Sequence, residues 1–295
     1  MKKSPLVSIV IPCYNHQNYV QECIQSVIDQ DYQNIELIII DDGSSDNSVQ
    51  KIEEMIYACQ QRFIRFEFRH RANKGLCATL NEALQWCEGE YYSAIASDDI
   101  MFDCKTSTQI KIIEEKKIIY TNLVGVLTKL SLIGDTEKQF NTPFKKNYTI
   151  SGFEEFFLQE TALTTPSLLL NREKVINAGG YDESLAVEDV DLILKITHAG
   201  GEVLSINKPL VYYRRHNNNL SNQKDHVLNE VFNTLKKYSK HALYNKACSK
   251  AFMVRAHSEK EKLIRWKFMI KALKKYPKNI FSISFLKFII KMIIK

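Results

Sequence analysis

The sequence predicts an α/β protein built on a Rossmann-like, open and mostly parallel sheet with helices on both faces. Residues 6–12 and 35–40 are short apolar runs typical of buried strands, and apolar residues recur at helical spacing from Val20 to Ile28 between them. Two buried strands joined by a helix lie parallel, with a right-handed crossover. Ligands of such sheets bind beyond the carboxyl ends of the strands, so we expect a site after residues 12 and 40.

The alternation of strands and helices continues to residue 99. The next expected elements are a helix with Val49, Ile52, Met55 and Ile56 on its buried face, a strand at 64–68, a helix at 76–87 and a strand at 91–96. This order is typical of a doubly wound sheet. Polar residues follow its strands at one edge: Tyr14 and Asn15, then Asp41 and Asp42, then Ser97, Asp98 and Asp99.

The remainder of the chain divides into an irregular middle section and a helical end. The middle section predicts a strand at 118–127, a polar loop over the site at 131–150, a helix at 153–158, a strand at 167–170, a helix ending at Gly179, a helix at 188–198 and a strand at 210–213. Only helical patterns remain after residue 222. We therefore expect a sheet domain over 1–221 and a C-terminal helical region over 222–295.

Composition and cysteine usage indicate a cytoplasmic protein. A hydrophobic content of 45% and a charged content of 25% are ordinary for a soluble globular chain. No apolar segment follows Met1, Lys2 and Lys3, so we expect no secretory signal. The seven cysteines are scattered without a Cys-x-x-Cys pair, which favours reduced core residues over a disulfide or zinc framework.

Two acidic pairs and one basic cluster are the candidates for chemistry. Asp98 and Asp99 follow a strand, and hard carboxylate oxygens suit Mg²⁺ or Mn²⁺ beside a diphosphate; the alternative is that they only cap the next helix. The pair at 188–189 opens a helix and is interpreted either as a general base for an acceptor hydroxyl or as a simple cap. The cluster at 214–216 either binds phosphate and metal or is a solvated edge.

At this point the residues resemble a known family, the family 2 glycosyltransferases. The motifs that carry the resemblance occur in the family's order over about residues 5–221: Val10-Ile11-Pro12-Cys13-Tyr14-Asn15, Asp41-Asp42-Gly43-Ser44, Asn73-Lys74-Gly75, Ser97-Asp98-Asp99, Gly179-Gly180-Tyr181-Asp182, Glu188-Asp189 and Tyr213-Arg214-Arg215-His216. The resemblance implies a GT-A fold, a nucleotide-sugar donor, a divalent metal and inversion at the anomeric carbon.

The resemblance also implies roles for individual residues. Those implied to bind the nucleotide are Pro12, Tyr14, Asn15, Asp41, Asp42, Arg71, Asn73, Ser97 and Asp98, with a uracil contact for Asp42 or its neighbour Asp41. Those implied to bind metal are Asp98, Asp99 and His216, and those for phosphate are Arg214 and Arg215. Asp189 matches the catalytic base and Glu188 lies beside it.

One departure from the family pattern concerns the metal. The family often has Asp where this chain has Ala96, so its first acid is missing. Metal binding is then expected to depend on Asp98, helped by Asp99 and His216, and to be weaker. The chain also lacks the Gln-x-x-Arg-Trp signature that resembles processive synthases, which favours single addition by a hexosyl- or N-acetylhexosaminyltransferase.

The basic C-terminal tail predicts a membrane partner. Residues 260–295 contain eleven Lys or Arg and one acid, which gives a net charge of +10. Because the whole chain has a net charge of +6, the first 259 residues have a net charge of −4. Residues 279–294 are apolar but interrupted by lysine, too short to span a bilayer, and suit a helix on an anionic leaflet. The alternative is a helix packed on the protein. Because these basic residues are not on an aromatic-bearing sheet face, nucleic acid is an unlikely partner.

Together these features predict transfer from a UDP-sugar to a lipid-linked glycan at the inner face of the plasma membrane, as in bacterial O-antigen or capsule synthesis. The rival enzyme class, a sugar nucleotidyltransferase, needs a Gly-rich basic loop after the first strand, and residues 12–16 are not one. A second rival is a catalytically weak nucleotide-sugar-binding module docked in a synthase complex. Only Ala96 favours that module.

Overall fold

The computed structural model describes residues 4–133, 148–217 and 219–293 of the chain. Two compact units are present: a sheet unit of residues 1–153 and 163–216, and a helical unit of residues 154–162 and 217–295. The predicted division after residue 221 lies slightly beyond the point at which the chain passes from one unit to the other.

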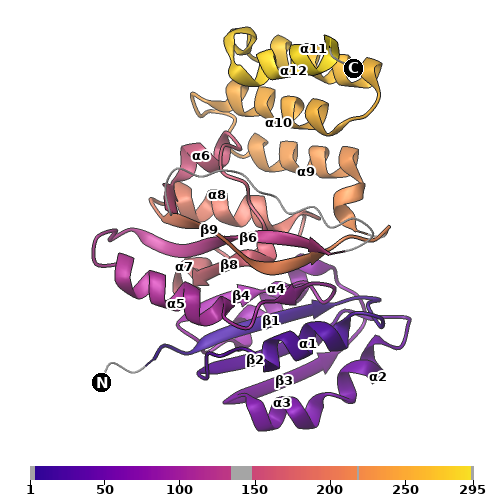
Figure 1. The fold of residues 1–295 in the computed structure, drawn as a ribbon, viewed down its shortest axis with the longest axis vertical. Helices are drawn as coiled ribbons and strands as arrows, with labels where there is room; N and C mark the ends of the chain where they lie inside the picture. The colour runs from indigo at the N-terminus through magenta and orange to yellow at the C-terminus, as the bar shows by residue number, and fades with distance from the viewer. Residues whose placement is uncertain (1–3, 134–147, 218, 294–295) are drawn as a thin grey trace. The chain divides into compact units, whose positions relative to one another are not determined.

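The sheet unit is organised around one mixed sheet (Figure 1) whose strand order is β3-β2-β1-β4-β8-β6-β9-β5, with β7 paired to β9. The strands are β1 (Val7–Cys13), β2 (Ile35–Asp41), β3 (Arg65–His70), β4 (Tyr91–Ala94), β5 (Ile100–Met101), β6 (Leu123–Ile133), β7 (Tyr148–Ser151), β8 (Leu168–Asn171) and β9 (Glu202–Arg214). The pairs β3-β2, β2-β1 and β1-β4 are parallel, as predicted. β8 runs antiparallel to β4 and β6, so the second half of the sheet is mixed.

The parallel half buries both faces of its strands. Ile9 and Leu37 on one face and Val10 and Ile38 on the other are fully buried, which explains why these strands are almost continuously apolar rather than alternating. The seven cysteines are free, and six of them are buried, as expected of core residues. All three parallel pairings place the carboxyl ends of β1, β2 and β4 at one edge of the sheet, where the polar residues collect.

The helices of the sheet unit agree with the predicted pattern at most positions. They are α1 (Val20–Ile28), α2 (Ser48–Glu53), α3 (Ile56–Arg62), α4 (Leu76–Trp86), α5 (Lys105–Lys116), α7 (Arg172–Asn177) and α8 (Glu188–His198), with a 3-10 turn η1 (Thr165–Ser167). The single helix expected after Asp42 is two short helices. No apolar pattern predicted α5, because polar side chains such as Thr106 and Gln109 occupy its buried face.

Two predictions for the middle of the chain need correction. The strand expected at 118–127 begins only at Leu123, because α5 and its turn precede it. Residues 131–133 belong to β6 and residues 148–150 to β7, so the ends of the predicted loop are strands, whereas 134–147 lie outside the described residues. β7 is half-buried and pairs only with β9, and an edge strand of this kind does not need an apolar sequence.

The helical unit has its own small core. Its elements are α6 (Phe153–Phe157), η2 (Leu220–Asn222), α9 (Lys224–Lys236), α10 (Tyr244–Ser258), α11 (Lys262–Lys275), η3 (Pro277–Phe281) and α12 (Ile283–Ile293). Met253, Phe268, Met269 and Phe288 are buried together. Within the described part of the chain, no helix has both the length and the apolar character that crossing a bilayer requires.

Candidate functional site

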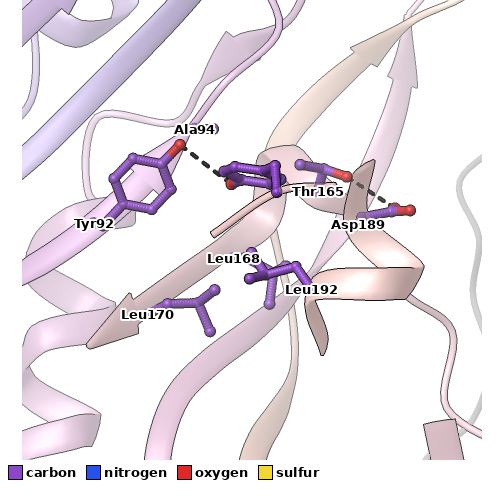
Figure 2. A pocket seen from close by; sticks show the side chains of 8 residues that line it. Tyr92, Ala94, Thr165, Leu168, Leu170, Asp189 and Leu192 are labelled. Carbon is purple, nitrogen blue, oxygen red and sulfur yellow. Dashed lines mark hydrogen bonds between the residues drawn. The ribbon is translucent and has the colours of Figure 1, made fainter. Parts of the chain in front are cut away.

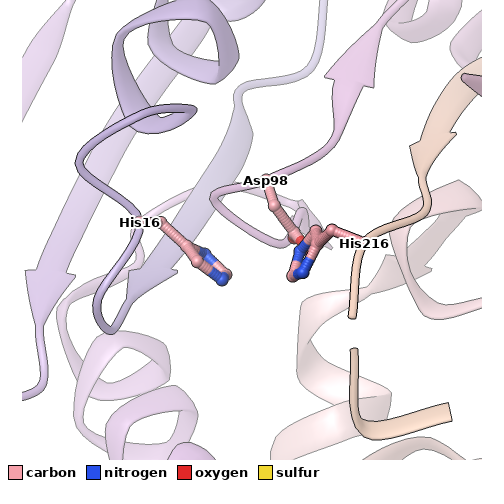
Figure 3. Close-up of side chains that lie close together, drawn as sticks. All are labelled: His16, Asp98 and His216. Carbon is pink, nitrogen blue, oxygen red and sulfur yellow. The ribbon is translucent and has the colours of Figure 1, made fainter. Parts of the chain in front are cut away.

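The loops that follow β1, β4 and β9 bring His16, Asp98 and His216 together (Figure 3). One ligand atom from each side chain lies within 4.8 Å of the others. His216 Nε2 is 2.9 Å from Asp98 Oδ2, and His16 Nδ1 is 2.7 Å from the hydroxyl of Ser97. The His216 ring is stacked on Tyr19 at 5.2 Å. Three potential metal ligands therefore converge at the predicted edge of the sheet.

Asp99, although adjacent to Asp98, is outside this cluster and has a different contact. It is fully buried, and its Oδ1 accepts a 2.9 Å hydrogen bond from the backbone N–H of Arg214. Burial, and secondarily the charge of Asp98, raises the pKa of Asp99 to about 8. Its contact joins the loop after β4 to the end of β9.

Arg214 is engaged with the same loop rather than directed to open solvent. Its Nε donates to the backbone oxygen of Asp98 at 2.9 Å, and its guanidinium pairs with Glu22 and lies 5.0 Å from the centroid of the Tyr19 ring. Arg215 is exposed, and its backbone N–H donates to Ile133 at 3.0 Å. Of the two arginines predicted to bind phosphate, Arg215 is thus the more accessible.

The side chains of the cluster fit a divalent metal. A carboxylate and two imidazoles are common ligands of first-row divalent ions. Burial lowers the pKa of His16, opposed in part by the charge of Asp98, and the lowered pKa favours the neutral ring that can bind a metal. Two of the predicted metal ligands, Asp98 and His216, belong to the cluster, and the third member is His16 in place of Asp99.

The two acids after β2 are buried and bonded within the protein. Asp41 accepts from the backbone N–H of Gly43 and from both the N–H and the hydroxyl of Ser44. Asp42 pairs with Arg71 and accepts from the backbone N–H groups of Lys74 (2.8 Å) and Gly75 (2.9 Å). Both side chains thus organise the loops in which the predicted nucleotide contacts lie.

Gly43 allows those two loops to approach each other. Its φ of +78° is a conformation that favours glycine, and a Cβ there would lie 2.6 Å from the backbone nitrogen of Asn73. The Asn73 side chain also donates to the backbone oxygen of Asp42 at 2.8 Å. Arg71, which pairs with Asp42, is held at its Nε by Glu82 at 2.7 Å. The predicted residues Asp42, Arg71 and Asn73 therefore form one connected network.

The remaining predicted nucleotide residues are Pro12, Tyr14 and Asn15 at the end of β1 and in the loop after it, and Ser97 in the loop after β4. Tyr14 is 51% exposed, Asn15 is exposed and Pro12 is half-buried. Asn15 has a left-handed φ of 54°, and its side chain accepts from the backbone N–H of Ser45 at 2.8 Å. Ser97 is buried and contacts His16. Tyr14 is thus free to contact a planar ligand, whereas Asn15 shapes its loop.

A second cluster joins Glu188 and Asp189, at the start of α8, to Thr165; Figure 2 shows the contact between Thr165 and Asp189. The Thr165 hydroxyl oxygen lies 3.1 Å from Glu188 Oε1 and 2.8 Å from Asp189 Oδ2. A hydroxyl has one hydrogen, so both contacts are fully satisfied only when one carboxyl is protonated. Burial, and then the charge of Asp189, raises the pKa of Glu188 to about 7, and burial also raises that of Asp189. The pair can hold a proton near neutral pH.

The Asp189 side chain borders a mainly apolar pocket (Figure 2). The pocket is lined by Tyr92, Ala94, Thr165, Leu168, Leu170, Tyr181, Asp189 and Leu192. The hydroxyls of Tyr181 and Tyr92 are hydrogen-bonded to each other at 3.2 Å. Apolar surroundings of this kind are what make ionisation of the two acids unfavourable.

Three residues that contact the predicted site, His16, Tyr19 and Thr165, were not predicted. His16 and Tyr19 follow the polar residues after β1, so their position just beyond the carboxyl end of that strand is the signal that could have identified them. Thr165 had no such signal, because its contact with residues 188–189 is made only when η1 and α8 come together.

Comparisons with known proteins identify the family of the chain. Residues 8–167 match the model of the family described as Glycosyl transferase family 2. An uncharacterized glycosyltransferase of Rickettsia felis is 37% identical over 38% of this chain and 18% of its own length, and one of Haemophilus influenzae is 31% identical over 58% and 64%. The chain thus spans less than two thirds of these relatives.

A third relative is covered more fully. It is the UDP-Glc:alpha-D-GlcNAc-diphosphoundecaprenol beta-1,3-glucosyltransferase WfaP of Escherichia coli, 28% identical over 78% of this chain and 86% of its own length.

Solved structures resemble the chain over most of its length. S. aureus TarS in complex with UDP-GlcNAc has a TM-score of 0.61 at 16% identity and covers 92% of this chain, which covers 73% of that structure. The mannosyltransferase PcManGT of Pyrobaculum calidifontis, in complex with GDP-Man and Mn²⁺, has a TM-score of 0.61 at 14% identity, with coverages of 94% and 87%. At such identities the likeness shows the fold, and it confirms the predicted fold class.

Proposed function

Because the chain belongs to glycosyl transferase family 2, which confirms the predicted resemblance and its GT-A fold, we propose that it transfers a single sugar from a UDP-sugar to a hydroxyl of a lipid-linked glycan. The observation that carries the proposal is the pairing of two clusters on one sheet unit. His16, Asp98 and His216 can hold a metal, while Asp189 has the raised pKa of a general base.

The proposed chemistry assigns separate tasks to these clusters. A bound Mn²⁺ or Mg²⁺ would neutralise the charge that develops on the diphosphate leaving group. Asp189 takes the proton of the acceptor hydroxyl as that oxygen attacks the anomeric carbon, so the configuration inverts in a single displacement. Thr165 orients the Asp189 carboxylate through its 2.8 Å hydrogen bond.

The proposed donor and acceptor come from what similar proteins bind or act on. The E. coli relative is a glucosyltransferase that uses UDP-Glc and GlcNAc-diphosphoundecaprenol, and TarS binds UDP-GlcNAc. A lipid-diphosphate acceptor of this class agrees with the basic C-terminal tail, because both belong at an anionic membrane. We assign the enzyme to bacterial surface-polysaccharide assembly on this basis.

Calorimetry of UDP binding tests the donor site. We expect Mn²⁺ to strengthen UDP binding to the wild type and expect Asp98→Ala to remove this gain, whereas Asp103→Ala, an exposed acid at the start of α5, serves as a control. If UDP binds neither with nor without metal, the donor assignment is wrong.

A transfer assay tests the catalytic assignment and separates an enzyme from a non-catalytic module. With UDP-glucose and a GlcNAc-diphosphate lipid, the folded Asp189→Asn variant is expected to lose at least about a hundred-fold in kcat, because it cannot accept the acceptor proton. Near-normal transfer by that variant would refute the assigned base. No transfer and no donor hydrolysis by the wild type would favour the module.

The membrane part of the proposal rests on α12, which has two apolar faces. One face packs inside the helical unit: Phe288 is fully buried beside Met253 and Phe268. The other face is exposed, with Ile283 at 73%, Leu286 at 59% and Ile290 at 45%. The sequence left packing on the protein and membrane binding as alternatives. In the structure the buried face suits packing, and the exposed apolar face suits membrane binding. We place the exposed face on an anionic leaflet.

Point substitutions test this surface better than truncation, because removal of α12 would also remove Phe288 from the core. We expect Leu286→Ser with Ile290→Ser to reduce sedimentation with anionic vesicles while leaving folding unchanged. Ile118→Ser, which alters an exposed isoleucine of the sheet unit, is the control. Undiminished vesicle binding by the double variant would place the membrane contact elsewhere.

A further inference from the structure

The cluster of His16, Asp98 and His216 includes a potential metal ligand outside the family's usual position, which is residue 96 in this chain. Ala96 precedes Asp98 by two residues, and its methyl group cannot bind a metal. Asp99 is fully buried and contacts Arg214 instead. His16, from the loop after β1, is the residue whose ligand atom lies close to those of Asp98 and His216.

The fold presents His16 through a well-anchored loop. Its backbone N–H donates to the hydroxyl of Ser48 at 2.9 Å, and the N–H of the preceding Asn15 donates to Ser44 at 2.8 Å. The ring is fixed as well, because its Nδ1 is 2.7 Å from the Ser97 hydroxyl. Hydrogen bonding of one imidazole nitrogen, which leaves the other for the metal, is typical of histidine ligands.

The spacing of the cluster is compatible with one shared ion. Ligand atoms about 2.1 Å from a metal lie roughly 3 to 4.2 Å from one another. The observed separations are within 4.8 Å, so closure around an ion needs each ligand atom to move by about 1 Å or less. Rotation of the half-buried side chains of His16 and His216 can supply such movements.

We propose that His16 is a metal ligand that replaces the carboxylate absent at position 96, so that the site binds through two imidazoles and one carboxylate and prefers Mn²⁺ to Mg²⁺. The inference rests on the proposed function, because the same metal would neutralise the donor diphosphate. Magnesium binds through oxygen and retains several waters, whereas imidazole is a ligand of transition metals. The chain would thereby select a transition metal where an all-carboxylate site would accept either ion.

Manganese binding to the full-length protein tests the proposal without any sugar transfer. Binding is determined from the free Mn²⁺ signal in electron paramagnetic resonance, measured in the presence of UDP. Nitrogen ligands of the bound Mn²⁺ are detected by electron spin-echo envelope modulation. We expect the wild type to show modulation from two imidazoles. His16→Ala should bind Mn²⁺ at least about ten-fold more weakly, with modulation from one imidazole. The control, His226→Ala, changes an exposed histidine on α9.

Two further variants test the same assignment, and one of them, His16→Asp, keeps the proposal refutable if His16→Ala fails to fold. His16→Asp should retain Mn²⁺ while its preference for Mn²⁺ over Mg²⁺ falls, and Ala96→Asp added to His16→Ala should recover affinity. Unchanged affinity and nitrogen modulation in His16→Ala, or an unchanged metal preference in His16→Asp, would overturn the assignment. Absence of Mn²⁺ binding by the wild type would also overturn it, while UDP calorimetry without metal separately reports whether the donor site exists.

Discussion

Replacing Glu188 by glutamine removes one of the two carboxyls that share the Thr165 hydroxyl. Glutamine has nearly the shape of the protonated acid and keeps an oxygen that can accept from Thr165. Because burial and the neighbouring Asp189 charge raise the pKa of Glu188 to about 7, the wild-type protein must protonate Glu188 or bear a second buried charge. The variant is freed from this choice, so its stability should depend less on pH.

The size of the effect follows from the shift. An acid whose pKa is raised on folding causes no penalty below its unfolded value, here about 4.5, and the full penalty only above its folded value, here about 7. A difference of this size corresponds to about 3 kcal/mol. The free energy of unfolding of Glu188→Gln, relative to wild type, should therefore rise between pH 5 and pH 8 by as much as about 3 kcal/mol.

Urea denaturation at a series of pH values measures this difference. The matched control is Glu173→Gln, which removes an exposed carboxylate from the surface of α7. Transfer activity should persist in Glu188→Gln, since Asp189 is the assigned base. A stability difference between Glu188→Gln and wild type that stays constant from pH 5 to pH 8 would refute the claim that these surroundings favour the protonated acid.

Three further predictions concern other contacts. Thr165→Val, which keeps the shape but removes the hydrogen bond to Asp189, should lower kcat about ten-fold with little change in donor KM; unchanged kcat in steady-state assays would exclude a positioning role. Gly43→Ala should cost about 1–3 kcal/mol in urea unfolding, because its Cβ would meet Asn73, and unchanged stability would contradict that clash. Lys105 is buried and its pKa is lowered to about 7, so Lys105→Met should stabilise the protein most below pH 7 and progressively less up to about pH 10; a pH-independent gain would contradict it.

The parallel half of the sheet could be predicted because the residues that favour a strand locally are also the apolar residues that its buried position requires. Residues 35–41 are apolar on both faces, and helices cover both, so the continuous run indicates the strand directly. α5 carries the opposite lesson. Two polar side chains are buried on it: Lys105 donates a hydrogen bond to Ser93, and the Gln109 amide group donates to backbone oxygens. The apolar spacing that would reveal the helix is therefore absent.

The sequence predicted which residues lie at the carboxyl ends of the strands, but not which side chains contact each other there. Asp41, Asp42 and Asp98 could be placed at one sheet edge, since parallel strands deliver their carboxyl ends together. Which carboxylates remain available depends on neighbours distant in sequence: Asp42 is engaged by Arg71, and Asp99 by Arg214. Sequence spacing contains no information about such pairings, so the metal ligands could not be told from their structural neighbours.

The loops after β1 and β4 show why a missing carboxylate need not remove a metal site. A ligand set requires donor atoms at suitable distances, and those atoms can come from any strand end at the same edge. In this chain the loop after β1 carries His16 to the position next to Asp98, and Ser97 fixes its ring. If His16 binds the metal as we propose, the change from a carboxylate to an imidazole would alter the preference among metals while preserving the place where the donor diphosphate would bind. Motif comparison alone would therefore underestimate the site, because it scores the loss at Ala96 without registering the compensating residue eighty positions earlier.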